Sequence, residues 1–182
     1  VNGVDGPYST TTPVAVSYVP LVLVHGFQTS DNPNPWAGTV SLLESQGYVV
    51  DRIDYYVDQA MWNTTYRIEA IGIYVGQQIG AITTRHNCSQ VDILAHSMGG
   101  LAVRCYIAEM GPVNPSNTNL RIPFLAYGGN VRKLITLGTP HYGSFLTNWA
   151  DVWPLNRTDL VSERDALIQE MSYGSRFMFD LR

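Results

Sequence analysis

The chain has 182 residues, of which 45% are hydrophobic and only 14% are charged, and its net charge at pH 7 is −4. This composition indicates one globular domain that hides roughly 70% of its unfolded surface, and it excludes an intrinsically disordered protein. The chain contains no run of 18 apolar residues, which excludes a membrane-spanning helix. Lys133 is the single lysine and the ten arginines are scattered, so no nucleic-acid partner is expected.

The first strong element lies near the N-terminus. Residues 1–17 are rich in Ser, Thr, Pro and Gly and predict an extended arm, and the domain is expected to span 18–182. The segment Pro20–Val24 is a continuous apolar run that ends at His25 and Gly26. A run that is apolar on both faces is typical of a central parallel strand with helices on each side.

Helices and strands alternate along the rest of the chain. We expect helices over 36–46 and 162–171, and strands over 49–55, 91–94 and 131–138, with a Pro- and Asn-rich loop over 111–119. A stripe at spacings of three and four residues marks another helix, capped by Asn63 or Thr64, and contains Ile68, Ile71, Val75, Ile79 and Ile82. The alternation predicts an α/β fold with a doubly wound, mostly parallel sheet, which binds ligands at the carboxyl ends of its strands.

The segment Ala95–Gly100, with the sequence Ala-His-Ser-Met-Gly-Gly, stands between a predicted strand and a predicted helix over 101–110. A serine at such a sharp corner is typical of a nucleophile elbow, which needs small residues two positions before and after it. Ala95 and Gly99 meet that need. The pattern therefore predicts Ser97 as a catalytic nucleophile.

Attack by a serine on an ester creates an oxyanion, which preorganised donors must stabilise. At an elbow one donor is the backbone N–H of the next residue, here Met98. The second is expected from the loop after the first central strand, where Phe27 follows His25 and Gly26. These positions and the segment Leu137–Gly143 all follow predicted strands, so we expect them to meet at one edge of the sheet.

Over residues 18 to 180 the sequence resembles the α/β-hydrolase lipases and esterases, through His-Gly-Phe, Ala-His-Ser-Met-Gly-Gly and Leu-Gly-Thr-Pro-His-x-Gly. The resemblance implies an α/β-hydrolase fold and a secreted carboxylic-ester hydrolase that acts on acylglycerols or simpler esters without a metal or organic cofactor. Residues matching the family's functional positions are Ser97 as nucleophile and Phe27 and Met98 as oxyanion donors. His25 and His96 match motif histidines with structural roles.

The catalytic triad is not complete in this sequence. In the resembled family the acid and then the base follow the serine, but His141 is the one histidine after Ser97 and belongs to the Thr-Pro-His motif. His141 and Asp151 are therefore only weak candidates for base and acid. The other acidic residues of this region read as solvated charges: Asp159, Glu163, Asp165, Glu170 and Asp180.

We therefore expect a C-terminally incomplete sheet whose open edge lies beside the strand over 131–138. A second polypeptide or a symmetry mate is the expected partner there, since an exposed edge promotes aggregation. Residues 140–175 are a candidate cap or lid, in which Phe145, Leu146 and two tryptophans would contact a lipid interface.

Secretion is also favoured by three matches to the N-glycosylation pattern, at Asn63, Asn87 and Asn156. The two cysteines, Cys88 and Cys105, fit either one disulfide or two thiols. Two other functions stay open at this stage. The chain could be a catalytically silent fragment that binds a partner or ligand, or an enzyme with another substrate, such as a thioesterase or an inositol deacylase.

Overall fold

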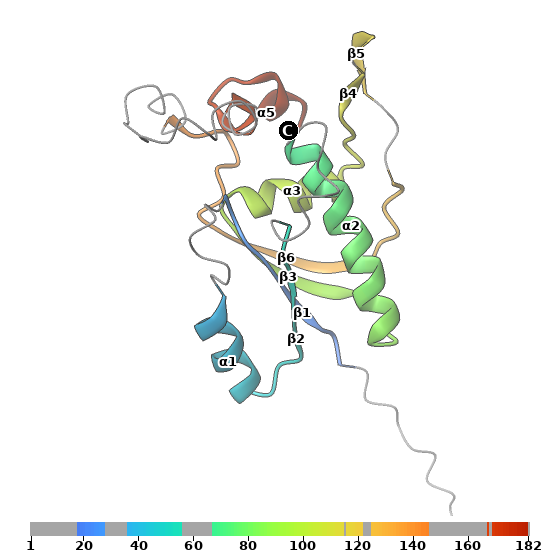
Figure 1. Ribbon diagram of the computed structural model, residues 1–182, viewed down its shortest axis with the longest axis vertical. Helices are drawn as coiled ribbons and strands as arrows, with labels where there is room; N and C mark the ends of the chain where they lie inside the picture. The colour runs from blue at the N-terminus through green and yellow to red at the C-terminus, as the bar shows by residue number, and fades with distance from the viewer. Residues whose placement is uncertain are drawn as a thin grey trace, which may run out of the picture.

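The computed structural model describes residues 18–27, 36–55, 67–114, 116–121, 125–145, 167 and 169–181. Four parallel strands form the central sheet in the order β2-β1-β3-β6, namely β1 (Leu21–Val24), β2 (Val50–Ile53), β3 (Val91–His96) and β6 (Val131–Leu137) (Figure 1). The parallel α/β sheet predicted from the sequence is confirmed. The predicted arm over 1–17 lies outside the described residues.

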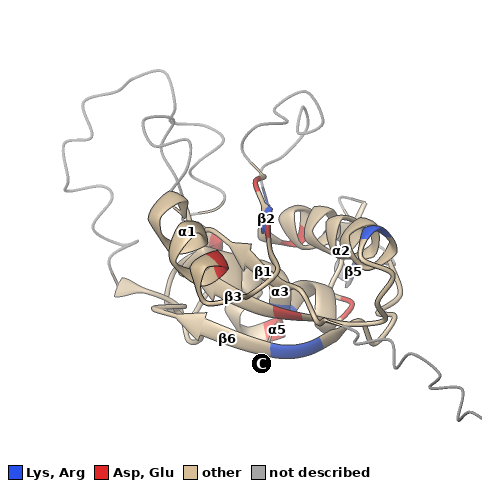
Figure 2. Ribbon diagram, turned by 90° about the horizontal axis from the view of Figure 1, so that it is seen from below, with Lys and Arg blue, Asp and Glu red and all other residues tan. Residues whose placement is uncertain are grey.

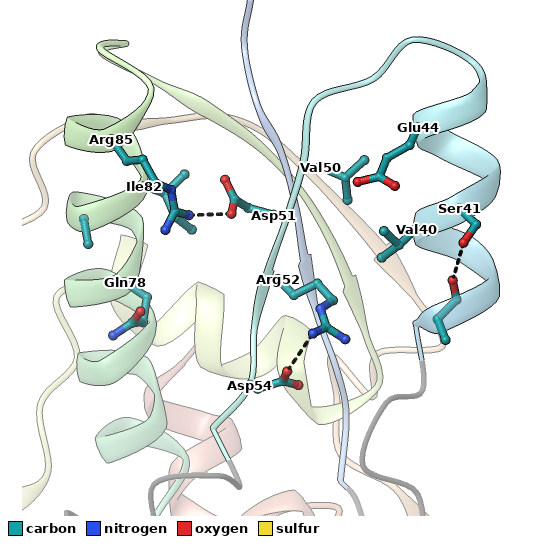
Figure 3. A pocket seen from close by; sticks show the side chains of 12 residues that line it. Val40, Ser41, Glu44, Val50, Asp51, Arg52, Asp54, Gln78, Ile82 and Arg85 are labelled. Carbon is teal, nitrogen blue, oxygen red and sulfur yellow. Dashed lines mark hydrogen bonds and ion pairs between the residues drawn. The ribbon is translucent and has the colours of Figure 1, made fainter.

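Helices pack on both sides of this sheet. The helices α2 (Ile68–Arg85) and α3 (Met98–Ile107) pack against each other so closely that a Cβ atom at Gly72 would lie 2.9 Å from the Ala102 carbonyl oxygen. Helix α1 (Ala37–Ser45) lies on the other side of β2 from α2 (Figure 3). The main core joins the strands to α2 and α3, and it includes Val22, Val24, Ile71, Val75, Ile79, Ile93, Ala95, Leu101 and Tyr106.

The C-terminal part of the predicted structure needs correction. The stretch 111–119, predicted as a loop, contains the antiparallel strand β4 (Val113–Asn114) and most of its partner strand β5 (Asn117–Arg121). Asn114 stabilises the connection between them, because its Oδ1 accepts a hydrogen bond from the Ser116 N–H at 2.9 Å. Leu167 and residues 169–171 of the predicted helix over 162–171 are helical, and α5 (Arg176–Asp180) follows them.

Helix α2 begins later than predicted. Its N-cap residue is Arg67, not Asn63 or Thr64, and the Arg67 side chain makes no capping hydrogen bond. Instead the carboxyl group of Glu170 accepts from the Ile68 N–H at 2.8 Å and from Arg67 Nη1 at 3.1 Å. The expectation that Glu170 is a solvated charge is wrong, because it is 7% exposed and caps a helix.

Glu170 lies next to a second buried carboxyl group, that of Glu69 in the first turn of α2. Burial first, and then the negative charge of Glu69, raises the pKa of Glu170 from 4.5 to about 8. Arg121 bridges Glu69 Oε1 at 2.8 Å and Asp180 Oδ2 at 2.5 Å, so Asp180, which is exposed as expected, also forms an ion pair. These contacts fasten the C-terminal residues of the chain to the start of α2.

Strand β6 forms one edge of the described sheet. Ile135 and Leu137 on one of its faces are 50% and 44% exposed, and the neighbouring Lys133 is also exposed. At its start Arg132 donates two hydrogen bonds, of 2.8 and 2.6 Å, to Asp92 on β3. Lys and Arg stand at separate places along the described elements (Figure 2), in line with the expectation of scattered basic residues.

The described residues also show the state of the two cysteines and whether any helix could span a membrane. Cys88 and Cys105 are both free thiols, so the disulfide alternative is not realised. Burial, the largest effect, and the charges of nearby carboxylates raise the pKa of the Cys105 thiol. None of the described helices combines the length and the apolar character needed to cross a membrane.

Candidate active site

Ser97 occupies the corner between β3 and α3, as predicted. Its backbone has φ 53° and ψ −127°, which is left-handed φ space that L-residues rarely adopt, and its side chain is half-buried. Helix α3 begins at the next residue, Met98, rather than at Leu101 as predicted, so Ser97 alone separates β3 from α3. The strained backbone holds the hydroxyl group at the carboxyl end of the central strands.

The three sequence motifs meet at this corner. A Cβ atom at Gly26 would lie 2.6 Å from Ser97 Cβ, and one at Gly99 would lie 2.2 Å from the His25 carbonyl oxygen. Gly100 is equally close to the third motif, because its Cβ would lie 2.2 Å from Thr139 Oγ1. The elbow and the two loops beside it therefore interlock through glycines, and the predicted convergence is confirmed.

Of the two predicted oxyanion donors, Met98 follows Ser97 along the backbone and Phe27 lies in the loop after β1 that packs against Ser97. Met98 is the first residue of α3, so its N–H is among those that an α-helix leaves without an internal partner, at the positive end of the helix dipole. The Met98 side chain is fully buried in the core. Phe27 follows Gly26, which touches Ser97, and its partly buried ring packs against the core. Stabilisation of an oxyanion by these two backbone N–H groups stays a prediction.

His25 is a structural residue, as the resemblance implied. It is 1% exposed, and burial lowers its pKa, although the Gly26 carbonyl and then Asp54 act in the opposite direction. Its neutral ring donates from Nδ1 to the Gly26 carbonyl oxygen at 2.8 Å and accepts at Nε2 from the Tyr55 N–H at 3.4 Å. Sequence analysis did not single out Tyr55; its position as the last residue of a predicted strand was the available signal.

Among the described residues, no hydrogen bond joins the ring of another histidine to Ser97. His141 accepts from Arg104 Nη1 at Nδ1 (3.2 Å) and lies 3.1 Å from Thr136 Oγ1 through Nε2, and burial and then the Arg104 charge lower its pKa. His86 pairs with Asp51, and the exposed His96 ring packs edge-on against Trp36. Both ring nitrogens of His141 are thus engaged away from Ser97, and Asp151 lies outside the described residues.

A hollow of about 590 Å³ lies along the outer strand β2, between α1 and α2 (Figure 3). Its charged side chains pair with one another, Asp51 with Arg85 and Arg52 with Asp54. Strand β1 separates β2 from β3, so this hollow is not beside Ser97. Within the described ranges, no group of three or more His, Cys, Asp or Glu side chains is placed to hold a metal ion.

The sheet, its flanking helices and the serine elbow define an α/β-hydrolase fold. The chain belongs to the family described as "Putative serine esterase (DUF676)", which matches residues 20–164.

Solved structures show the same fold. A lipase from Bacillus licheniformis in its mature form is 21% identical with a TM-score of 0.64, over 94% of this chain and 62% of the lipase. Lipase 1 from Pelosinus fermentans is 19% identical with a TM-score of 0.50, over 75% of this chain and 45% of that lipase. The chain thus spans less than two thirds of the length of either lipase.

Proposed function

We propose that this chain carries the nucleophile and the oxyanion hole of a serine carboxylic-ester hydrolase of the lipase or esterase type. The observation that carries the proposal is the strained Ser97 at the start of α3, interlocked with the Gly26 loop. Membership of a serine esterase family supports the same reaction class. The proposed substrates are acylglycerols or simpler esters.

In this reaction Ser97 Oγ attacks the acyl carbon and forms a C–O bond, while the carbonyl π electrons move to oxygen. The Met98 and Phe27 N–H groups stabilise the resulting oxyanion. Collapse of the tetrahedral intermediate expels the alcohol, and water then hydrolyses the acyl-enzyme in the same way. The hydroxyl proton needs a general base, and the described structure brings none of the four histidines to Ser97 for that role.

Labelling with a fluorophosphonate probe tests the nucleophile in the full-length protein. We expect label on the wild type, none on Ser97→Ala, and full label on the control Ser41→Ala, since Ser41 is exposed on α1 and donates only to a helix carbonyl. Label that persists in Ser97→Ala would show that another residue reacts. Absence of label on the folded wild type would instead favour the catalytically silent alternative.

A chain-length series of nitrophenyl esters, together with emulsified triglyceride, then separates the substrate classes. Hydrolysis of long-chain esters and of the emulsion supports a lipase, and hydrolysis of short, dissolved esters alone supports an esterase. Faster turnover of matched thioesters would move the assignment to a thioesterase. Each activity is expected to disappear in Ser97→Ala, because all of them use the same nucleophile.

A further inference from the structure

Tyr55 lies directly after β2 and reaches across to the loop that follows β1. It is 3% exposed, and its ring stacks on His25 with 3.9 Å between the ring centroids. Its hydroxyl group lies 2.6 Å from the His25 carbonyl oxygen and 2.7 Å from the Gly26 carbonyl oxygen. One phenolic hydrogen is therefore shared between two consecutive carbonyl groups of the same loop.

The Gly26 carbonyl also accepts from His25 Nδ1 at 2.8 Å, so two donors hold it from the Tyr55–His25 side. The Gly26 carbonyl can only accept, so the ring hydrogen of His25 lies on Nδ1, and the Tyr55 N–H, 3.4 Å from Nε2, suits that tautomer. The carbonyl of Gly26 is thus held by the hydroxyl group of Tyr55 and by the imidazole of His25.

This carbonyl belongs to the peptide unit whose nitrogen is that of Phe27. A trans peptide is planar, and its C=O and N–H bonds point in opposite directions; the described chain contains no cis peptide. Fixing the Gly26 oxygen toward Tyr55 therefore fixes the Phe27 N–H in the opposite direction. The same unit starts at Gly26, whose Cα is in tight contact with Ser97.

We propose that Tyr55 is a positioning residue for the oxyanion hole, which locks the Gly26–Phe27 peptide unit in the orientation that presents the Phe27 N–H to the reacting oxygen. Without the hydroxyl group only the His25 bond holds this carbonyl, so the peptide unit rotates more readily. A rotated unit would turn the carbonyl rather than the N–H toward the oxyanion. The inference rests on the proposed function, because it assigns a role within that reaction.

Tyr55→Phe tests whether the hydroxyl group holds this peptide unit, since the substitution removes one oxygen atom and keeps the stacked ring. Loss of a whole oxyanion donor costs about 10² to 10³ in kcat, and the His25 bond remains, so we expect kcat to fall roughly 10- to 100-fold with KM nearly unchanged. The inhibition constant of a trifluoromethyl ketone, whose adduct carries an oxyanion, should rise by the same factor. All rates are normalised to titrated active sites.

Tyr106→Phe is the matched control, because Tyr106 is 2% exposed and its hydroxyl group donates to Asn130 Oδ1 at 2.8 Å, away from the loop. We expect similar destabilisation of the two variants, but an unchanged kcat per active site and an unchanged inhibition constant for Tyr106→Phe. Equal kinetic constants in Tyr55→Phe and wild type would overturn the role of Tyr55 while Ser97-dependent hydrolysis stands. Wild-type hydrolysis that survives Ser97→Ala would overturn the proposed function itself.

Discussion

Replacing Glu170 by Gln should change how the stability of the chain depends on pH. Glu170 is buried beside Glu69, and its pKa is raised from 4.5 to about 8. At neutral pH the protonated carboxyl group can accept from the Ile68 N–H and donate to Glu69, whose Oε2 is buried and has no other hydrogen-bond partner among the described residues. A glutamine at position 170 offers the same donor and acceptor at every pH.

The direction in which stability changes with pH follows from the number of protons that the folded and unfolded chains bind. Between pH 4.5 and about 8 the folded chain holds a proton on Glu170 that the unfolded chain has released, so stability falls as pH rises through this window. One proton changes the free energy of unfolding by about 1.4 kcal/mol per pH unit. From pH 5.5 to 7.0 the wild type should therefore lose about 2 kcal/mol that Glu170→Gln retains.

Urea unfolding at several pH values measures this difference, because titrating groups away from the Glu69–Glu170 pair contribute equally to both proteins and cancel. The same substitution at Glu44, which is exposed on α1, is the control and should give a curve parallel to that of the wild type. Parallel curves for Glu170→Gln and wild type would refute the shared proton between Glu69 and Glu170.

Two Gly→Ala substitutions should have opposite effects. Gly99→Ala places a Cβ atom 2.2 Å from the His25 carbonyl oxygen, so the backbone must move at the elbow. We expect activity to fall about 10²-fold and Tm to fall as well. Unchanged activity would contradict the close packing of the elbow against the His25 loop. Gly80→Ala in α2 meets nothing within 4 Å and should stabilise the helix by about 0.5–1 kcal/mol, which raises Tm by roughly 2–4 °C in a thermal melt. A lower Tm for Gly80→Ala would show that the helix does not tolerate a methyl group there.

The strands of the central sheet were predictable because their signal is local. The predicted ranges of β1, β3 and β6 agree with the structure to within two residues, and β1 was recognised from its continuous apolar run, which suits a strand buried on both faces. The start of α2 was not predictable, because its capping group is a carboxylate 102 residues further along the chain. A capping preference at Asn63 or Thr64 carries no information about such a distant partner.

The residues of the candidate site also fall into a predictable and an unpredictable group. Ser97 and its small neighbours follow from the steric demands of a strand-to-helix corner, and the predicted meeting of the three motifs follows from parallel strands ending at one edge. Tyr55 was missed because its role depends on where a hydroxyl group falls after packing, 29 and 30 residues away from the carbonyl groups that it holds. The partial burial of His141 and the burial of Glu170 were likewise set by tertiary contacts.

The backbone of Ser97 has a consequence for how this chain can change in evolution. A φ of 53° with a ψ of −127° costs a side-chain-bearing residue about 1–3 kcal/mol, whereas glycine adopts it freely. If selection acted on stability alone, glycine would therefore replace this serine early. A serine held at that cost is what continued selection for the hydroxyl group would maintain, at the expense of a more stable fold.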